Sequence, residues 1–381
     1  MELERVSPVL AAVVFWAAAC GGPRLQPEGM IDLNFPLTEA SRMKCRGPLI
    51  PKITAGPGGL ILVATRTGFL QALDPEKTTI RWTSFVGAGA PPPVVVGGRI
   101  VCALKKGGVI GLDEAGQEAW SLKSDKPVRD DLRVVGGRVV FRNAEGFLTA
   151  LNPADGVIAW KVSVPTAADW TADGERIILR TLDNRLLIFR PDGSPAGDYL
   201  IGGKAAGDIG LVEDYAILGF AAGYIGAYDL TTGNKRWLQH LGGVPVGPPV
   251  SDGRNVYIVL SNQIIAAFHL KRGDLLYWKP LSGRAAFPPR FIGSTVFVSS
   301  RSPRLQAFSA KAGEVKVAFE GGGEILAPPE LIGSKIFLAI NGETEQEDIL
   351  VSLLTSPPES PESPEKTECA DIEKESGEIK K

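Results

Sequence analysis

Residues that commonly build enzyme and metal sites are scarce in this sequence. Of 381 residues, 2 are histidines and 4 are cysteines. A histidine-rich zinc site or a Ser-His-Asp triad would therefore depend on His240 or His269. The formal net charge is only −2, which gives no reason to expect a nucleic-acid partner. We expect no catalytic residue, no metal, no cofactor and no nucleic-acid binding.

Long hydrophobic runs are also missing. The apolar run at residues 9–19 is shorter than the roughly 20 residues of a membrane-spanning helix. Because it ends in small residues, we expect residues 1–19 to be a signal peptide. The segment Ala-Ala-Ala-Cys at 17–20 resembles a bacterial lipobox, which implies lipidation of Cys20 and a lipidated linker at residues 20–28. A plain secretory signal with an incidental cysteine is the alternative.

The residue after this cysteine bears on location. Gly21 stands there, and not aspartate. By analogy with lipoprotein sorting, this favours the outer membrane, with the protein facing the periplasm. Of the other cysteines, Cys45 and Cys102 could form a disulfide in such an oxidising compartment. Both could equally be free thiols, because sequence spacing does not fix their geometry.

Glycine and proline, in contrast, are abundant. The sequence has 45 glycines and 29 prolines, both above average usage, and both residue types oppose helix interiors. The glycines do not recur at every third position, so collagen is excluded as well. Hydrophobic residues make up 44% of the chain, which is enough to bury a large core. A mostly helical protein and a wholly disordered one are therefore both excluded.

The C-terminal segment 356–381 differs in composition from the rest of the chain. It is rich in Pro, Glu, Ser and Lys, contains Cys369, and carries eight acidic residues and four lysines. Such a segment cannot bury enough apolar surface to offset the entropy lost on ordering. We therefore expect a disordered acidic tail.

One phrase recurs through the body of the chain: an apolar doublet, a polar residue, a turn with glycine, and then an aromatic residue. From Leu73 to Phe308 its copies are 39, 39, 38, 39, 40 and 40 residues apart, and an eighth copy at 352–354 lacks the aromatic residue. We expect the aromatic residues to be structural. They are Trp82, Trp120, Trp160, Tyr199, Trp237, Trp278 and Phe319.

Each copy divides into four short strands. In the second copy they are expected at residues 94–96, 100–104 and 109–112 and around Trp120. Gly97-Gly98, Gly136-Gly137 and Asp173-Gly174 suit the two-residue primed turns of β-hairpins. Four antiparallel strands every 39 residues are typical of a β-propeller blade. We therefore predict an all-β fold, an eight-bladed β-propeller of four-stranded antiparallel blades, over residues 29–355.

The last repeat lacks its fourth strand, because the tail begins soon after Leu354. Residues 29–36 belong to no repeat and resemble the fourth strand of another repeat, 156–162, in their apolar order. We predict that this N-terminal strand completes the eighth blade. Closure of the ring in this way leaves no blade without a neighbour.

The repeated phrase lacks the Trp-Asp and Gly-His marks of WD40 blades and resembles the PQQ-type propeller repeat. The resemblance is clearest at residues 150–160 and 227–237 and extends over 29–354. In that family the tryptophan packs between blades. An eight-bladed propeller of this type on a lipid anchor is similar to BamB, a family of outer-membrane protein assembly lipoproteins.

The resemblance to BamB implies a protein-binding scaffold that is not an enzyme. It implies a partner in outer-membrane β-barrel assembly, namely the periplasmic portion of the barrel-forming subunit. We expect a monomer within this hetero-complex, attached to the membrane through its lipid alone. The alternatives are a PQQ- or quinone-dependent oxidoreductase, which the lack of adjacent cysteines disfavours, and a propeller lipoprotein with an unrelated cell-envelope partner.

Aligned repeats indicate one candidate binding site. Where the innermost strand begins, four blades have proline: Pro92, Pro248, Pro288 and Pro328. Three consecutive blades have Asp131, Asp169 and Asp208 there, and the first blade has Ile53. Because innermost strands line the channel of a propeller, we expect an acidic arc near one mouth of the channel.

The acidic arc suggests contact with a partner protein. Its carboxylates would receive an Arg or Lys of the partner, with Trp170 as an apolar anchor and Arg129 beside them. A Ca²⁺ site is an alternative, since this ion takes several oxygen ligands. In the third interpretation, the aspartates only stabilise turns through bonds to their own backbone.

Overall fold

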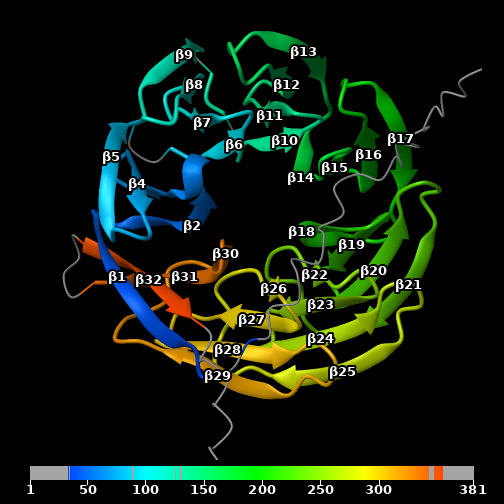
Figure 1. Ribbon diagram of the computed structural model, residues 1–381. Helices are drawn as coiled ribbons and strands as arrows, with labels where there is room; N and C mark the ends of the chain where they lie inside the picture. Colours follow the sequence, from blue (N-terminus) through cyan, green and yellow to red (C-terminus); the bar gives the residue numbers. More distant parts are fainter. Residues whose placement is uncertain are drawn as a thin grey trace, which may run out of the picture.

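The chain forms a ring of eight β-sheets around a central channel (Figure 1). This computed structural model describes residues 33, 35–87, 90–124, 126–128, 131–342 and 347–354. The expected signal peptide, lipidated linker and acidic tail, and with them Cys20, lie outside the described residues, as does Arg129. Every sheet has four antiparallel strands. The prediction of an all-β, eight-bladed propeller is confirmed.

The first four blades are each built from four consecutive strands, in order from the channel outward. Blade one has β2 (Leu49–Ala55), β3 (Ile61–Thr65), β4 (Phe69–Asp74) and β5 (Thr79–Phe85), with a 3-10 turn at Pro57–Gly59. Blade two has β6 (Val94–Val96), β7 (Arg99–Ala103), β8 (Val109–Leu112) and β9 (Glu118–Leu122). Blade three has β10 (Arg133–Val135), β11 (Arg138–Arg142), β12 (Phe147–Leu151) and β13 (Ile158–Ser163). Blade four has β14 (Ala167–Ala172), β15 (Ile177–Thr181), β16 (Arg185–Phe189) and β17 (Pro195–Leu200).

The next three blades follow the same order, and the eighth joins the two ends of the described chain. Blade five has β18 (Ala205–Val212), β19 (Tyr215–Phe220), β20 (Tyr224–Asp229) and β21 (Lys235–His240). Blade six has β22 (Val250–Ser251), β23 (Asn255–Leu260), β24 (Ile264–His269) and β25 (Leu275–Pro280). Blade seven has β26 (Arg290–Ile292), β27 (Thr295–Ser299), β28 (Arg304–Ser309) and β29 (Val315–Glu320). Blade eight has β30 (Glu330–Ile332), β31 (Lys335–Asn341), β32 (Glu347–Leu354) and, outermost, β1 (Thr38–Arg46).

Glycine pairs make two of the three predicted primed turns. Both residues of Gly97-Gly98 and of Gly136-Gly137 have positive φ, between 53° and 73°, as a type I′ turn requires. The prediction for Asp173-Gly174 is wrong, because Ala172 pairs with Ile177 and four residues separate the strands. There the Asp173 carboxylate accepts the N–H groups of the two residues at the end of the turn, so a side chain stabilises a wider turn.

Aromatic residues of the outermost strands link each blade to the next. The Nε1 of Trp82 donates to Glu114 O at 2.9 Å, and that of Trp237 donates to Leu270 O at 2.6 Å. Equivalent bonds are made by Trp120 to Pro153 O, Trp160 to Pro191 O and Tyr199 to Thr231 O. Each ring lies against a glycine of positive φ in the next blade, such as Gly116 or Gly273, where a Cβ would overlap the ring.

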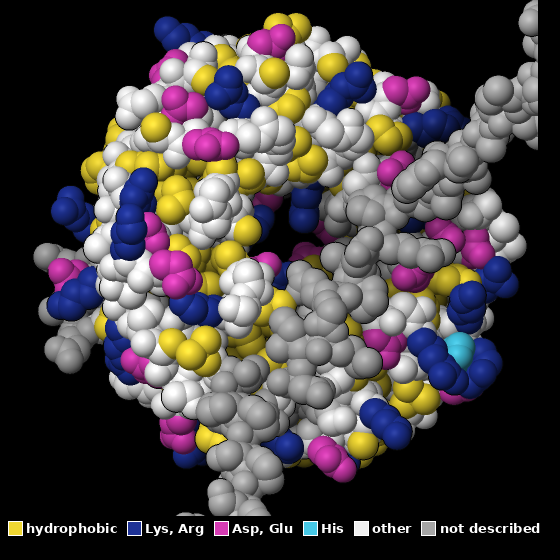
Figure 2. All heavy atoms as spheres, viewed as in Figure 1, with side chains coloured by type: hydrophobic (Ala, Val, Ile, Leu, Met, Phe, Trp, Pro, Cys, Tyr) yellow, Lys and Arg dark blue, Asp and Glu magenta, His cyan; other side chains and the backbone are white. Residues whose placement is uncertain are grey.

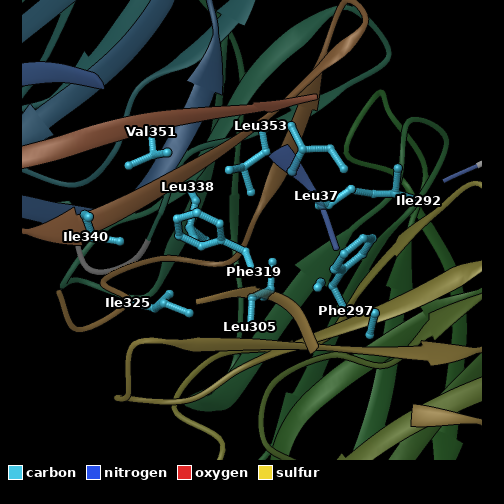
Figure 3. Close-up of a cluster of buried hydrophobic side chains, with 13 residues drawn as sticks. Leu37, Ile292, Phe297, Leu305, Phe319, Ile325, Leu338, Ile340, Val351 and Leu353 are labelled. Atoms are coloured by element: carbon cyan, nitrogen blue, oxygen red, sulfur yellow. The ribbon is translucent and has the colours of Figure 1, made fainter. Parts of the chain in front are cut away.

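Blades six and seven depart from the predicted set of aromatic residues. Tyr277, and not Trp278, pairs with Ala267 and donates through its hydroxyl to Ser309 O at 3.2 Å. The prediction for Trp278 is wrong, because its side chain lies on the other side of β25 and is 55% exposed. In blade seven Lys316 takes the equivalent position. Phe319 is buried in the core between blades seven and eight (Figure 3).

The N-terminal strand closes the ring by pairing with β32, and the two lie side by side in Figure 1. The closure is therefore as predicted, but the closing strand is Thr38–Arg46 and not residues 29–36. Met43 and Cys45 point inward and are buried, whereas the alternate residues Arg42, Lys44 and Arg46 carry charges to the surface. Leu37, just before the strand, joins the core of blades seven and eight (Figure 3).

The two described cysteines are free thiols buried in different parts of the core. Cys45 lies between blades eight and one, and Cys102 between blades one and two. Burial raises the pKa of each thiol to about 12. Of the two possibilities that the sequence left open, the structure has the free thiols.

Across the described ranges, no helix is long and apolar enough to cross a membrane.

Candidate functional site

The three aspartates of the acidic arc lie at one level of the ring, in adjacent blades three, four and five. In each blade, the residue two positions after the aspartate pairs with the residue seven positions further on: Arg133 with Val140, Thr171 with Ile178, and Gly210 with Ile217. Equal register places the side chains of Asp131, Asp169 and Asp208 on the same side of their strands. The four prolines of blades two, six, seven and eight occupy the same level, two residues before Val94, Val250, Arg290 and Glu330.

Blade one contributes a cation to this level. The sequence alignment placed Ile53 there, but the pairing of β2 with β3 is irregular between Leu49 and Ile53. Ile53 pairs with Val63 and is buried in the core. Lys52, one residue earlier, therefore takes the position equivalent to the aspartates. The sequence period could not reveal this shift, because an irregular strand start leaves no mark in the spacing of the repeats.

Asp169 connects two blades. Its Oδ2 accepts the N–H of Ile209 from blade five at 2.8 Å, and its Oδ1 accepts the N–H of Trp170 at 2.7 Å. Burial raises the pKa of Asp169; the bond from Ile209 opposes this effect, and the nearby charge of Asp208 adds to it. Two backbone donors thus already occupy this carboxylate. Its first role is to hold blades four and five together.

The other two carboxylates are more open to solvent. Asp208 is exposed and Asp131 is half-buried. Trp170, which we expected to be an apolar anchor for the partner, is only 4% exposed and packs in the core between blades three and four. That prediction is therefore wrong, because the side of β14 opposite Asp169 faces a neighbouring blade. Of the three carboxylates, Asp208 and Asp131 are the two that remain accessible at this mouth.

Further charged residues line the channel, and the sequence alignment did not single them out. Figure 2 shows the central opening with basic and acidic side chains on its wall. Arg133, Arg290 and Glu330 each begin an innermost strand, and Arg290 Nη2 lies 2.9 Å from Glu330 Oε2 in the adjacent blade. They occupy the level two residues after the aspartates and prolines. A comparison of the residues two positions after the aspartates and prolines would have found them, since alternate residues share one side of a strand.

The structure does not favour a metal at this mouth. Nowhere in the described ranges do three or more His, Cys, Asp or Glu side chains form a group that could hold a metal ion, and the three aspartates belong to these ranges. The donor set for the alternative Ca²⁺ site is therefore not assembled. The two histidines lie outside the innermost strands, His240 at the end of β21 and His269 at the end of β24.

The chain resembles proteins of one family in sequence and in fold. A sequence profile described as outer membrane protein assembly factor BamB matches residues 38–188 and 70–319. Outer membrane protein assembly factor BamB of Yersinia pestis is 27% identical over 188 residues, which are 44% of this chain and 48% of that protein. The chain thus spans about half the length of the curated relatives that it matches.

Solved structures share the fold. The crystal structure of BamB from Moraxella catarrhalis superimposes with a TM-score of 0.64 at 16% identity, over 83% of this chain and 99% of that one. Quinohemoprotein alcohol dehydrogenase from Comamonas testosteroni gives a TM-score of 0.62 at 13% identity, over 86% of this chain and 78% of that one. At such identities these likenesses show the propeller fold alone. Because the sequence profile matches well over half of its length, the chain belongs to the BamB family.

Proposed function

We propose that this protein is a non-catalytic scaffold of outer-membrane protein assembly. The observation that carries the proposal is the channel mouth of a BamB-family propeller, where three adjacent blades present carboxylates and the described residues assemble no metal site. Carboxylates in a row suit the cationic side chains of a protein partner.

The partner in this proposal is the periplasmic portion of the barrel-forming assembly protein. Lipid on Cys20 would hold the propeller at the inner surface of the outer membrane, facing the periplasm, as a monomer within the hetero-complex. Support comes from the names of the relatives, which are outer membrane protein assembly factors, and from the lipobox-like segment before Cys20.

Each carboxylate has a distinct role in the proposed contact. Asp208 is exposed and Asp131 half-buried, so these two would accept bonds from an Arg or Lys of the partner. Asp169 links its own blade four to blade five through the N–H of Ile209. Bonds between ionised partners contribute roughly 1.5–3 kcal/mol each when they are shielded from water. Two such bonds would be enough for a measurable effect on capture.

The test is capture of the partner by crosslinking the lipidated protein in membranes and identifying what it retains. We expect an outer-membrane β-barrel assembly subunit, and at least tenfold less of it with the double variant Asp131→Asn/Asp208→Asn. The matched control is Glu114→Gln/Glu175→Gln, which changes two exposed carboxylates in turns at the opposite face. Recovery without any assembly subunit would overturn the proposal.

The oxidoreductase alternative finds little support in the residues present. A quinone with Ca²⁺ would need a set of oxygen ligands, and the described part of the channel assembles none. The sequence also lacks adjacent cysteines. Reduction of a dye after addition of PQQ and Ca²⁺ would favour the alternative, and we expect none.

A further inference from the structure

The channel carries a second charged feature, opposite in sign to the acidic arc. We define the cationic arc as Lys52 of blade one, Arg133 of blade three and Arg290 of blade seven. Arg133 and Arg290 are the first residues of β10 and β26, and each pairs with the residue seven positions further on. In β2, Thr54 takes the position equivalent to Arg133 and Arg290, and Lys52 lies two residues before it. All three therefore project from the same side of the innermost strands.

These side chains lie close enough to act on one another. Burial lowers the pKa of Lys52, and the charges that act on it belong to Asp131, Arg133, Arg290 and Glu330. These residues come from blades three, seven and eight, although more than 75 residues separate Lys52 from each of them in sequence. The wall of the opening in Figure 2 accordingly shows basic and acidic side chains together.

The arc is not fully paired. Arg290 bonds to Glu330, but the Nε atoms of Arg133 and Arg290 are buried without a hydrogen-bond partner in the part of the chain that the structure describes. The hydroxyl of Thr54, at the same level in blade one, is likewise buried without a hydrogen-bond partner among the described residues. Buried donors of cationic groups are costly to leave unpaired. Two such cationic donors and one hydroxyl around one channel indicate a place for an oxygen-rich, negatively charged group.

Charge is distributed unevenly around the channel. The cationic arc belongs to blades seven, one and three, whereas Asp131, Asp169 and Asp208 belong to blades three, four and five. Glu330 of blade eight lies between blades seven and one and is paired with Arg290, so Lys52 and Arg290 together still outnumber it. An anion that enters the channel would therefore be drawn to the side formed by blades seven and one and repelled from blades four and five. The two sides of the channel suit different groups of a ligand.

We propose that the cationic arc binds the carboxylates of an acidic polypeptide segment that enters the channel. Guanidinium groups match carboxylates through paired N–H donors, and a lysine adds a mobile third charge. We assign this segment to the chain's own residues 356–381, which follow β32 and carry eight acidic residues. This inference does not rest on the proposed function, because it concerns other residues and a ligand of opposite charge.

The test uses a fluorescent peptide of six glutamates as the probe, with binding to the full chain followed by anisotropy at low ionic strength. We expect the double variant Lys52→Gln/Arg133→Gln to weaken binding at least tenfold. Arg290 is left unchanged so that Glu330 keeps its ion pair. The matched control, Lys311→Gln/Arg301→Gln, removes one exposed lysine and one exposed arginine elsewhere and should stay within twofold of the unchanged protein.

A chain that ends at Thr355 tests the assignment to the tail. We expect tighter binding of the probe to this shorter chain, because the tail no longer competes for the arc, whereas equal binding would overturn the assignment to the tail. If the double variant does not fold, as judged by its urea midpoint, the single variant Lys52→Gln takes its place. The inference is overturned if neither chain binds the probe, or if the arc variants and the control bind it equally.

Discussion

At the scale of the residue, Asp169 combines a charge with a link between blades. Burial raises its pKa above the ordinary value of 3.8, so the folded state holds the proton more tightly than the unfolded chain. The stability that this proton contributes is present at acid pH and is lost as the pH rises from about 3.8 through the folded pKa. Among the residues at the channel mouth, this carboxylate thus couples blade packing to pH.

We predict that the stability advantage of the unchanged protein over Asp169→Asn decreases as the pH rises through that window. The free energies of unfolding would come from urea denaturation at a series of pH values. Glu175→Gln, at an exposed carboxylate of the opposite face, is the control and should keep the pH dependence of the unchanged protein. A difference between the unchanged protein and Asp169→Asn that stays constant, or grows with pH, would show that the buried carboxylate does not act in this way.

Two tryptophans in neighbouring blades provide a second prediction at this scale. Trp237 is buried, stacks on Phe268 and donates to Leu270 O, whereas Trp278 is 55% exposed. We predict that Trp237→Ala lowers the free energy of unfolding by about 3–5 kcal/mol, as expected for a buried tryptophan. Trp278→Ala should change it by less than about 0.5 kcal/mol. Urea denaturation of both variants checks this, and similar losses would contradict the assignment of Tyr277 to the interblade position.

At the scale of the element, β1 decides whether the ring closes. Met43 points inward and is 2% exposed, whereas Arg42, one residue away, points outward. We predict that Met43→Ala costs about 2–5 kcal/mol of stability, since it opens a cavity in the core between blades eight and one. Arg42→Ala removes only an exposed ion pair with Glu39, worth about 0–1 kcal/mol. Equal urea midpoints for the two variants would mean that β1 does not hold the ring.

The strands differ in how far the sequence could predict them. In blade two, Val94–Val96 and Val109–Leu112 were predicted to the residue, because prolines or glycine pairs precede these apolar runs and a glycine pair or the turn at Asp113 follows them. The strand Thr38–Arg46 was missed, because only Met43 and Cys45 mark its inner face among charged residues. Pairing with a distant strand, and not local composition, makes this segment a strand.

The candidate site was predictable only in part, for the same reason. The repeat period located Asp131, Asp169 and Asp208 at one level, because regular strands preserve spacing. It could not show that Trp170 is buried or that Asp169 is bonded to Ile209, since both depend on the neighbouring blade. Contacts between blades are set by the ring as a whole.

At the scale of the whole molecule, β1 and β32 hold the two ends of the chain together by a ladder of hydrogen bonds within one blade. Between one blade and the next, in contrast, the links are side-chain contacts and single hydrogen bonds, such as the bond from the Ile209 N–H to Asp169. A ring that opens between blades therefore breaks no ladder, whereas one that opens through blade eight must break the pairing of β1 with β32. This difference can be tested by moving the chain ends.

We predict that the position of the ends changes stability even when every native strand is kept. In two permuted chains, a two-residue turn would join Leu354 to Thr38, which are paired neighbours. One chain would begin between blades four and five, at Gly203, and the other within blade three, at Gly137. The first should have the lower free energy of unfolding, by at least about 1 kcal/mol, the net contribution of a typical hydrogen bond, because blades four and five are separate sheets and no ladder joins its ends. In the second, β10 and β11 still pair across the new ends, so equal midpoints, or a more stable first chain, would show that the ladder in the closing blade adds nothing to the ring.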